Sequence, residues 1–340
     1  MKFVCKNCFS DKELIGFILS QNEVMDCDCC GSKNVEVILF EELLDFFKEL
    51  FDNFKENEKG NSLISLIQAN WGLFNNLEIG NKILNHALIQ LNTHLKSSDD
   101  LVDFNDEILE NINYWHILKE QLKWEKRYLT DINLLTEDLG WDSFFESKTV
   151  IKKADIFFRA RLHHSENEDA YPDDKMFCPP KKNSSGGRAN PSGIPFLYLS
   201  DNEETILYEI RASYLDEISV ASFCLVDDFE GNIIISDFTE TPSLFAPNEV
   251  NKRIKSTLLK KLISRDLSTP MRRYDSELDY IPTQFICEFI KVFTGVQGIK
   301  FRSSLHSIGS NLVVFDQNYL KCLSVKKVRI TKVSINFKDI

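Results

Sequence analysis

The sequence has no long apolar run, and it is short of positive charge. No stretch approaches the roughly 20 apolar residues that a membrane-crossing helix needs, and the first residues, MKFVCKNC, lack the apolar core of a secretory signal. The 40 lysines and arginines face 52 aspartates and glutamates, which gives a formal net charge of -12. Because an acidic surface repels phosphates, nucleic acid is disfavoured as a partner. We therefore expect a cytoplasmic protein with no membrane partner.

The length and composition are those of a multidomain soluble protein. At 340 residues the chain is longer than one average domain, with 43% hydrophobic and 27% charged residues. The nine cysteines are not expected to form structural disulfides in a reducing compartment, so their clustering requires another explanation.

Five of the nine cysteines lie within the first 30 residues. Cys5 and Cys8 form one CxxC pair, and Cys27 and Cys30 form a second, directly followed by glycine. Two such pairs are typical of a structural zinc site, because four thiolates complete a tetrahedron and leave no position for water. Cys29 is left out of this set, although an exchange of Cys29 for one of the four remains open. We predict that Zn²⁺ is bound by these four thiolates.

The middle of the chain is predicted to be helical. Apolar residues recur at three- and four-residue spacing over 40–54, and further helical patterns cover 62–74, 82–95 and 108–130. The segment has almost no glycine or proline and no compact set of catalytic side chains. It is expected to form a helical bundle without chemistry of its own.

The second half of the chain changes character after Thr149. Segments typical of strands occur at 196–199, 220–226, 232–236 and 312–315. The intervening stretch 171–195 is rich in Pro, Gly, Ser and Asn, which predicts a long loop of the kind that often carries function.

Several separate segments of this half resemble the RES family, which is named after its Arg, Glu and Ser residues. The segments are, in order, FFRAR, CPP, GRANPSGIPFLYLS, ETILYEI, GIKFRSSL and SNLVVF, and they span residues 157–315. The resemblance implies a fold similar to that of ADP-ribosyltransferases, NAD⁺ as substrate, and a role as a bacterial toxin or antiphage defence effector. It leaves open whether the reaction is hydrolysis, phosphorolysis or ADP-ribosyl transfer.

The resemblance assigns catalytic roles to Arg159, Glu209 and Ser303. Glu209 is suited to stabilise the oxocarbenium-like ribose that develops when nicotinamide leaves. Arg159 and Arg161 are two residues apart, so on a strand both would face the same side and could grip a pyrophosphate. Ser303 is interpreted as a pocket ligand, with Ser304 as the alternative one residue away.

Further NAD-binding residues are expected in the loop and the strand that follows it. The glycine-rich turn offers backbone that a ligand can approach closely, and a tyrosine on the next strand can stack on a ring. The predicted set consists of Arg161, Gly187, Arg188, Asn190, Tyr198, Gln284 and Ser304.

The resemblance extends to RES proteins with an N-terminal zinc knuckle and a helical region of the HEPN type. We therefore predict an α+β multidomain protein with a four-cysteine zinc knuckle (1–36), a HEPN-like helical domain (37–147) and a mixed α/β RES domain (148–340). Active HEPN ribonucleases need an Arg with a nearby His, which Arg127 lacks. An antitoxin or regulatory protein and a second copy of the chain are the expected partners. The alternative is a zinc-dependent module that binds protein or nucleic acid, with an inactive RES domain.

Overall fold

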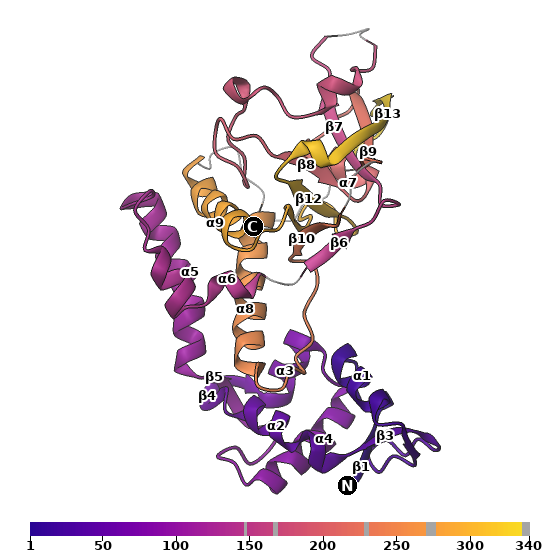
Figure 1. Ribbon diagram of the computed structural model, residues 1–340, viewed down its shortest axis with the longest axis vertical. Helices are drawn as coiled ribbons and strands as arrows, with labels where there is room; N and C mark the ends of the chain where they lie inside the picture. Colours follow the sequence, from indigo (N-terminus) through magenta and orange to yellow (C-terminus); the bar gives the residue numbers. More distant parts are fainter. Residues whose placement is uncertain (146–147, 166–168, 228–230, 270–276, 335–340) are drawn as a thin grey trace. The chain divides into compact units, whose positions relative to one another are not determined.

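The computed structural model describes residues 1–145, 148–165, 169–227, 231–269 and 277–334. Its chain contacts define two compact units (Figure 1). Unit 1 comprises Met1–Ile117 and Thr241–Leu259, and unit 2 comprises Leu118–Glu240 and Lys260–Ile340. The three-domain division predicted from the sequence stays a prediction. Within the described residues, no helix is both long and apolar enough to span a bilayer.

Unit 1 combines helices with two small sheets. The first sheet has the order β1-β3-β2 and the second pairs β4 with β5, both antiparallel. The elements are β1 (Phe3–Cys5), η1 (Lys6–Cys8), α1 (Lys12–Ser20), β2 (Glu23–Met25), β3 (Val35–Leu39), η2 (Phe40–Leu43), α2 (Leu44–Phe51), β4 (Phe54–Ser62), α3 (Leu63–Trp71), α4 (Leu77–Leu91), β5 (Leu101–Phe104), the first part of α5 (Asp106–Trp124) and the first part of α8 (Val250–Ser268).

The predicted helices of the middle region are present, with one addition. The structure gives η2 with α2, α3, α4 and α5 for the four predicted segments. Strands β4 and β5 were not predicted, because β4 reads FKENEKGNS and lacks the apolar alternation of a half-buried strand. The region 37–147 is therefore helical with a two-stranded sheet, and not a bundle of helices alone.

A distant segment, Thr241–Leu259, completes the core of unit 1. The Asp11 carboxylate accepts hydrogen bonds from the backbone N–H groups of Leu244 (2.6 Å) and Phe245 (3.2 Å). The Phe245 ring lies 5.0 Å from that of Phe46, centroid to centroid. A segment from the second half of the sequence is thus an integral part of unit 1.

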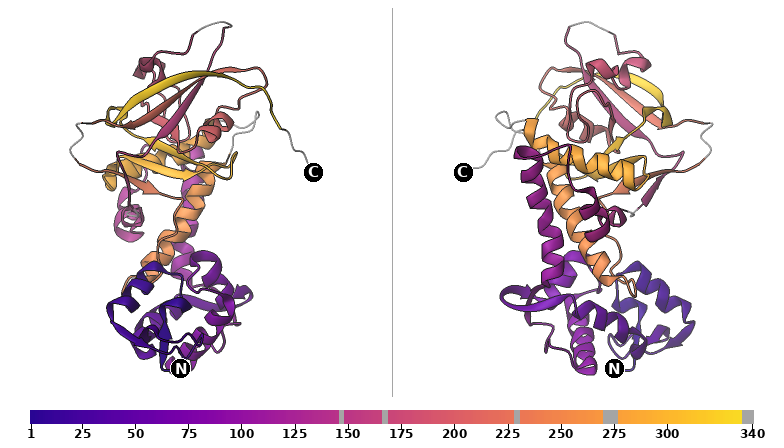
Figure 2. Two further views of the ribbon diagram at one scale, coloured as in Figure 1. Left: turned by 90° about the vertical axis from the view of Figure 1, so that its right-hand side faces the viewer. Right: turned by 60° about the vertical axis from the view of Figure 1, so that its left-hand side comes forward.

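Unit 2 is built around one large sheet. Its eight strands have the order β13-β9-β7-β8-β12-β11-β10-β6, and every neighbouring pair is antiparallel except β10 with β11. Figure 2 shows the long strand β13, in yellow, running beside β9. The strands are β6 (Lys148–Ile151), β7 (Phe157–Leu162), β8 (Leu197–Ser200), β9 (Glu217–Leu225), β10 (Ile233–Asp237), β11 (Gly298–Arg302), β12 (Ser310–Val314) and β13 (Leu320–Arg329).

The helices and helical turns of unit 2 include α7, which bears Glu209. They are the end of α5, η3 (Leu134–Asp138), α6 (Trp141–Phe144), η4 (Asp173–Met176), η5 (Lys181–Asn183), α7 (Glu203–Glu209), the end of α8 (Val250–Ser268), η6 (Glu277–Tyr280), α9 (Ile281–Phe293) and η7 (Gln317–Tyr319). The predicted strands correspond to β8, β9, β10 and β12, and the predicted loop contains only the short turns η4 and η5.

The sheet opens between β7 and β8. These two strands share one residue pair, Phe158 with Ser200, whereas β7 is paired along its whole length with β9. Where strands separate, their backbone groups must find other partners. The Arg159 guanidinium supplies one, because its Nη1 donates a hydrogen bond to the carbonyl oxygen of Tyr198 on β8 at 3.1 Å.

Candidate functional site

Helix α7 places Glu209 near the central strands β7, β8 and β12 of the sheet. The helix begins after Asn202, whose side chain accepts hydrogen bonds from the N–H groups of Glu204 (2.9 Å) and Thr205 (3.2 Å). Ile206 is buried in the same apolar cluster as Ala160 of β7. The cap fixes the start of this short helix, and the buried face holds its middle against the strands.

The Glu209 carboxylate is held through one of its two oxygens. Oε1 accepts a hydrogen bond from Ser303 Oγ at 2.6 Å and another from Asn311 Nδ2 at 2.8 Å. Oε2 accepts none from the residues that the structure describes. Ser303 and Asn311 are 7% and 9% exposed, so both bonds are shielded from water. The carboxylate is therefore oriented, with one oxygen available for a ligand.

The hydrogen bonds of Ser303 define its role. Its Oγ accepts from the backbone N–H groups of Leu305 (3.2 Å) and His306 (3.1 Å), which occupy the two lone pairs of the hydroxyl. The one hydroxyl proton is then directed to Glu209. A hydroxyl that receives two donors and gives its proton to a carboxylate is a positioning group and a poor nucleophile.

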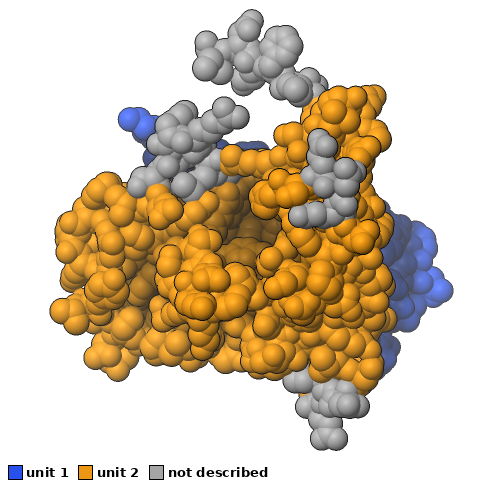
Figure 3. Space-filling model, turned by 90° about the horizontal axis from the view of Figure 1, so that it is seen from above, with its two compact units in different colours: residues 1–117, 241–259 blue, residues 118–240, 260–340 orange. Residues whose placement is uncertain are grey.

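Glu209 also lines a cleft of about 490 Å³ within unit 2. Figure 3 shows the hollowed face of this unit. The cleft is lined by Gly187, Arg188, Tyr198, Leu199, Ile206, Glu209, Arg211, Tyr280, Phe301, Leu305 and Asn311. Four of the residues predicted from the sequence, namely Gly187, Arg188, Tyr198 and Glu209, thus share one cavity.

A hydrogen-bond network fixes the glycine-rich turn against Tyr198. The Tyr198 hydroxyl donates to Asn190 Oδ1 at 2.7 Å and accepts from the Ala189 N–H at 3.0 Å. Burial raises the pKa of Tyr198, so the phenol stays protonated and keeps both bonds. A Cβ on Gly187 would lie 2.7 Å from the Tyr198 oxygen, which leaves space only for glycine. Gln284 Nε2 completes the turn by donating to the Gly187 carbonyl at 2.8 Å.

The predicted arginines occupy three different positions. Arg188 lines the cleft, and its Nη1 donates to the carbonyl of Leu267 at 2.6 Å. Arg161 lines a separate hollow, and its Nη2 donates to the carbonyl of Phe177 at 2.7 Å. Arg159 is only partly exposed, and its Nε is buried without a hydrogen-bond partner among the described residues. Burial and the neighbouring charge of Arg161 lower the pKa of Arg159 to about 10, so it remains a cation at neutral pH.

Ser303 and Ser304 have different surroundings. Ser303 contacts Glu209, whereas Ser304 is exposed and donates its hydrogen bond to the carbonyl of Ser268. Of the two alternatives left open by the sequence, Ser303 is the one that the structure brings to the carboxylate.

Sequence reasoning missed Asn311 and Arg211. Asn311 belongs to the segment SNLVVF, in which a buried amide among apolar strand residues was the available signal. A buried polar side chain requires a partner, and here the partner is Glu209. No sequence pattern marked Arg211.

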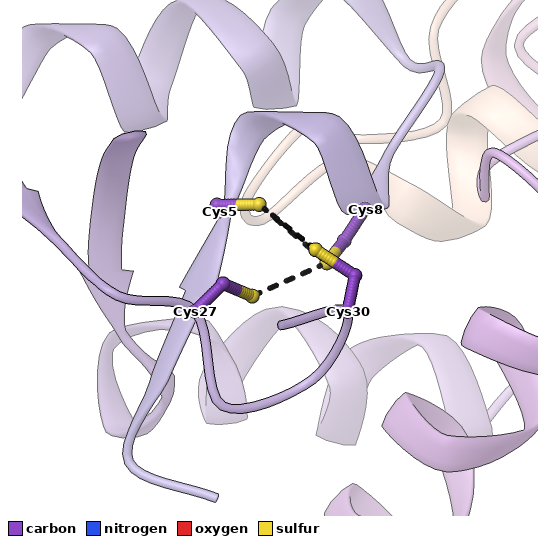
Figure 4. Close-up of side chains that lie close together, drawn as sticks. All are labelled: Cys5, Cys8, Cys27 and Cys30. Carbon is purple, nitrogen blue, oxygen red and sulfur yellow. Dashed lines mark hydrogen bonds between the residues drawn. The ribbon is translucent and has the colours of Figure 1, made fainter. Parts of the chain in front are cut away.

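The four predicted zinc ligands converge in unit 1. Figure 4 shows the sulfur atoms of Cys5, Cys8, Cys27 and Cys30 directed toward one another from two segments of the chain. All four lie within 4.8 Å of one another, and three sulfur–sulfur distances are 3.4, 3.6 and 3.8 Å. A tetrahedron with zinc–sulfur bonds of about 2.3 Å has edges of about 3.8 Å. The donor set and its spacing therefore fit a zinc ion, and Cys29 lies outside the set.

Comparison with known proteins identifies the class of the second half of the chain. Residues 156–336 match the family model described as the RES domain, which is just over half of the sequence. The chain therefore belongs to the RES-domain family. No curated protein matches it.

One solved structure with a similar chain is the crystal structure of the M. tuberculosis MbcT–MbcA toxin–antitoxin complex. The match has 12% sequence identity and a TM-score of 0.29, and it covers 56% of this chain and 91% of the other.

Proposed function

We propose that the cleft of unit 2 binds NAD⁺ and cleaves its nicotinamide–ribose bond. The observation that carries this proposal is the Glu209 carboxylate, which lines the cleft. Its Oε1 is fixed by Ser303 and Asn311, while its Oε2 has no hydrogen-bond partner among the described residues. Membership of the RES-domain family supports NAD⁺ as the substrate.

The reaction requires charge stabilisation more than acid catalysis. When the bond between the anomeric carbon of the ribose (C1″ of the product ADP-ribose, the C1′ carbon of the nicotinamide riboside) and the nicotinamide nitrogen breaks, its electron pair stays on the nitrogen, and nicotinamide leaves as a neutral molecule. The ribose becomes an oxocarbenium-like cation, which a fixed carboxylate stabilises. Glu209 Oε2 is placed to accept a hydrogen bond from a ribose hydroxyl and to bring negative charge near the developing cation. Water, phosphate or a macromolecular nucleophile then forms the new bond to C1′ and releases its proton to solvent.

The other residues of the cleft bind and orient the dinucleotide. A guanidinium has five N–H donors, and the bond from Arg188 to the Leu267 carbonyl uses one of them. The same guanidinium can therefore also bind the diphosphate. The Tyr198 hydroxyl is committed to Asn190 and Ala189, so the tyrosine contributes its ring to the ligand and not its oxygen. Gly187 lets the turn pack closely against Tyr198 and Asn190, where a side chain would clash, and so keeps the tyrosine ring beside the ligand.

The four thiolates of Cys5, Cys8, Cys27 and Cys30 are proposed to hold a structural Zn²⁺. Bound zinc would tie the η1 segment to the turn before β3 and thereby staple the N-terminal part of unit 1. A closed four-thiolate shell has no position for substrate, so zinc supplies stability here and takes no part in the reaction.

The proposed biological role is that of a toxin or antiphage effector that a regulatory partner restrains. The fold of its RES domain is proposed to resemble that of ADP-ribosyltransferases. The N-terminal helical region is proposed to be HEPN-like, to contribute to this restraint and to support dimerisation. Deleting residues 1–145 would test the restraint poorly, since Thr241–Leu259 would lose partners such as Asp11 and Phe46. Point substitutions in the full chain are the better approach.

The activity is tested by incubating the purified full-length protein with NAD⁺ and following nicotinamide by NMR. Parallel reactions with and without inorganic phosphate distinguish ADP-ribose from ADP-ribose 1″-phosphate, and mass spectrometry of added protein detects transfer to a macromolecule. The proposal predicts nicotinamide release in at least one of these reactions. No release under any of them would contradict it.

A further inference from the structure

Arg211 occupies an unusual position directly after the catalytic helix. Helix α7 ends at Glu209, Ile210 forms its C-cap, and the Arg211 N–H donates to the carbonyl of Tyr208 at 2.9 Å. The backbone of Arg211 is left-handed, with φ of 55°. This position after a helix normally holds glycine or asparagine, because a larger side chain is strained there.

Most non-glycine residues with a left-handed backbone in the described part of the chain are asparagines, which tolerate this conformation. Four of its six non-glycine residues with positive φ are asparagines, and the other two are Arg211 and Leu215. The six are Asn22, Asn34, Asn92, Arg211, Leu215 and Asn248. An arginine at such a site costs stability, and strained residues of this kind cluster at ligand sites.

A second, independent observation indicates what Arg211 does. Arg211 is among the residues that line the cleft, together with Arg188 and Glu209. A cleft with a fixed carboxylate repels an anionic ligand unless cations balance it. A guanidinium binds phosphate oxygens through two parallel N–H bonds, which lysine cannot reproduce.

We propose that Arg211 is a substrate-binding residue that, together with Arg188, holds the diphosphate of a nucleotide ligand in the cleft. The chain turns after Glu209, where Arg211 has a left-handed backbone, and Arg211 lines the same cleft as Glu209. This inference rests on the proposed function in one respect, namely that the ligand of the cleft carries a diphosphate.

The test measures binding of ADP-ribose to the full-length protein by isothermal titration calorimetry. ADP-ribose contains the diphosphate but no nicotinamide–ribose bond, so the result does not depend on turnover. Arg211→Gly removes the guanidinium and relieves the backbone strain. Losing a charge-assisted hydrogen bond should weaken ADP-ribose binding about ten- to a hundredfold. Relief of the left-handed strain should raise the melting midpoint by about 2–4 °C, and loss of the interaction that the Arg211 side chain makes subtracts from that rise.

Leu215→Gly is the matched control. Leu215 has φ of 70°, is 58% exposed and lies outside the lining of the cleft. This substitution should change the melting midpoint in the same direction and leave ADP-ribose affinity unaltered. Arg211→Lys keeps the positive charge but loses the paired N–H donors of the guanidinium. Its ADP-ribose affinity should lie between those of Arg211→Gly and the wild type.

The outcomes separate the two proposals. Wild-type affinity in Arg211→Gly, or no ADP-ribose binding by the wild type, would overturn the role of Arg211. Absence of nicotinamide release with ADP-ribose binding intact would overturn the proposed reaction while leaving the diphosphate site standing. Equal losses of affinity in Arg211→Gly and Leu215→Gly would show that the strained backbone, and not the guanidinium, controls binding.

Discussion

The cysteine cluster of unit 1 and the carboxylate site of unit 2 are both assembled from separate segments of the chain, yet they differ in completeness. Four thiols lie within 4.8 Å of one another and suffice for a tetrahedral ion. Glu209 has both described hydrogen bonds on one oxygen, while the other has no described partner. A closed set of polar groups stabilises a fold, whereas an oriented group with spare capacity can act on a ligand.

The largest expected effect on stability is that of removing zinc from the cysteine cluster of unit 1. Structural zinc contributes about 10–16 kcal/mol to the folding of small zinc-finger peptides, so its loss should unfold the N-terminal part of unit 1. Cys8→Ser is expected to abolish metal binding, while Cys29→Ser, which changes a thiol outside the set, should retain it. Metal content by atomic absorption and thermal unfolding by circular dichroism check both variants.

This pair of variants also resolves the choice of ligands. Full zinc content in Cys8→Ser would mean that Cys29 can replace it. Loss of zinc from Cys29→Ser, with Cys8→Ser unaffected, would exclude the proposed set.

The next largest effect concerns the groups that orient Glu209. Ser303→Ala and Asn311→Ala each remove one charge-assisted hydrogen bond, worth about 1.5–3 kcal/mol, and should lower the rate of nicotinamide release by about ten- to a hundredfold. Because both bonds end on the same oxygen, the double variant should lose less than the product of the two single effects. Rates measured at saturating NAD⁺ check this prediction.

Ser304→Ala is the matched control for these substitutions. Its hydroxyl contacts the Ser268 carbonyl and not Glu209, so its rate should equal that of the wild type. A larger rate loss in Ser304→Ala than in Ser303→Ala would refute the assigned roles.

A smaller effect is expected for the arginine that bridges the opening of the sheet. Arg159→Lys should lower the free energy of unfolding by about 1–3 kcal/mol, because the carbonyl of Tyr198 loses a well-oriented donor. Urea unfolding measures this loss, and ADP-ribose titration measures any accompanying loss of affinity. A decrease in affinity with unchanged stability would instead favour the phosphate-binding role predicted from the sequence.

The sequence predicts those features that local patterns encode. The CxxC spacing identified the four converging thiols, and the motif ETILYEI singled out Glu209, which the structure places at the end of a helix. Arg159 and Arg161 do lie on one strand, β7, as the pyrophosphate hypothesis assumed, but their hydrogen bonds go to different carbonyls, because the position of each side chain depends on where β8 and the long loop pack.

Tertiary packing accounts for what the sequence did not reveal. Asn311 is separated from Glu209 by about a hundred residues, and only the antiparallel pairing of β12 with β8 brings them together. The assignment of Thr241–Leu259 to unit 1 likewise has no local signal, since it depends on contacts with residues such as Asp11.

The central claim is that Glu209 is the group on which nicotinamide release depends. The most direct test compares nicotinamide release by the wild type and Glu209→Gln at matched zinc content and melting midpoint. Removing the charge that stabilises the ribose cation should lower the rate by about 10²–10³-fold, with ADP-ribose affinity largely retained. A Glu209→Gln variant that releases nicotinamide as fast as the wild type would contradict the account.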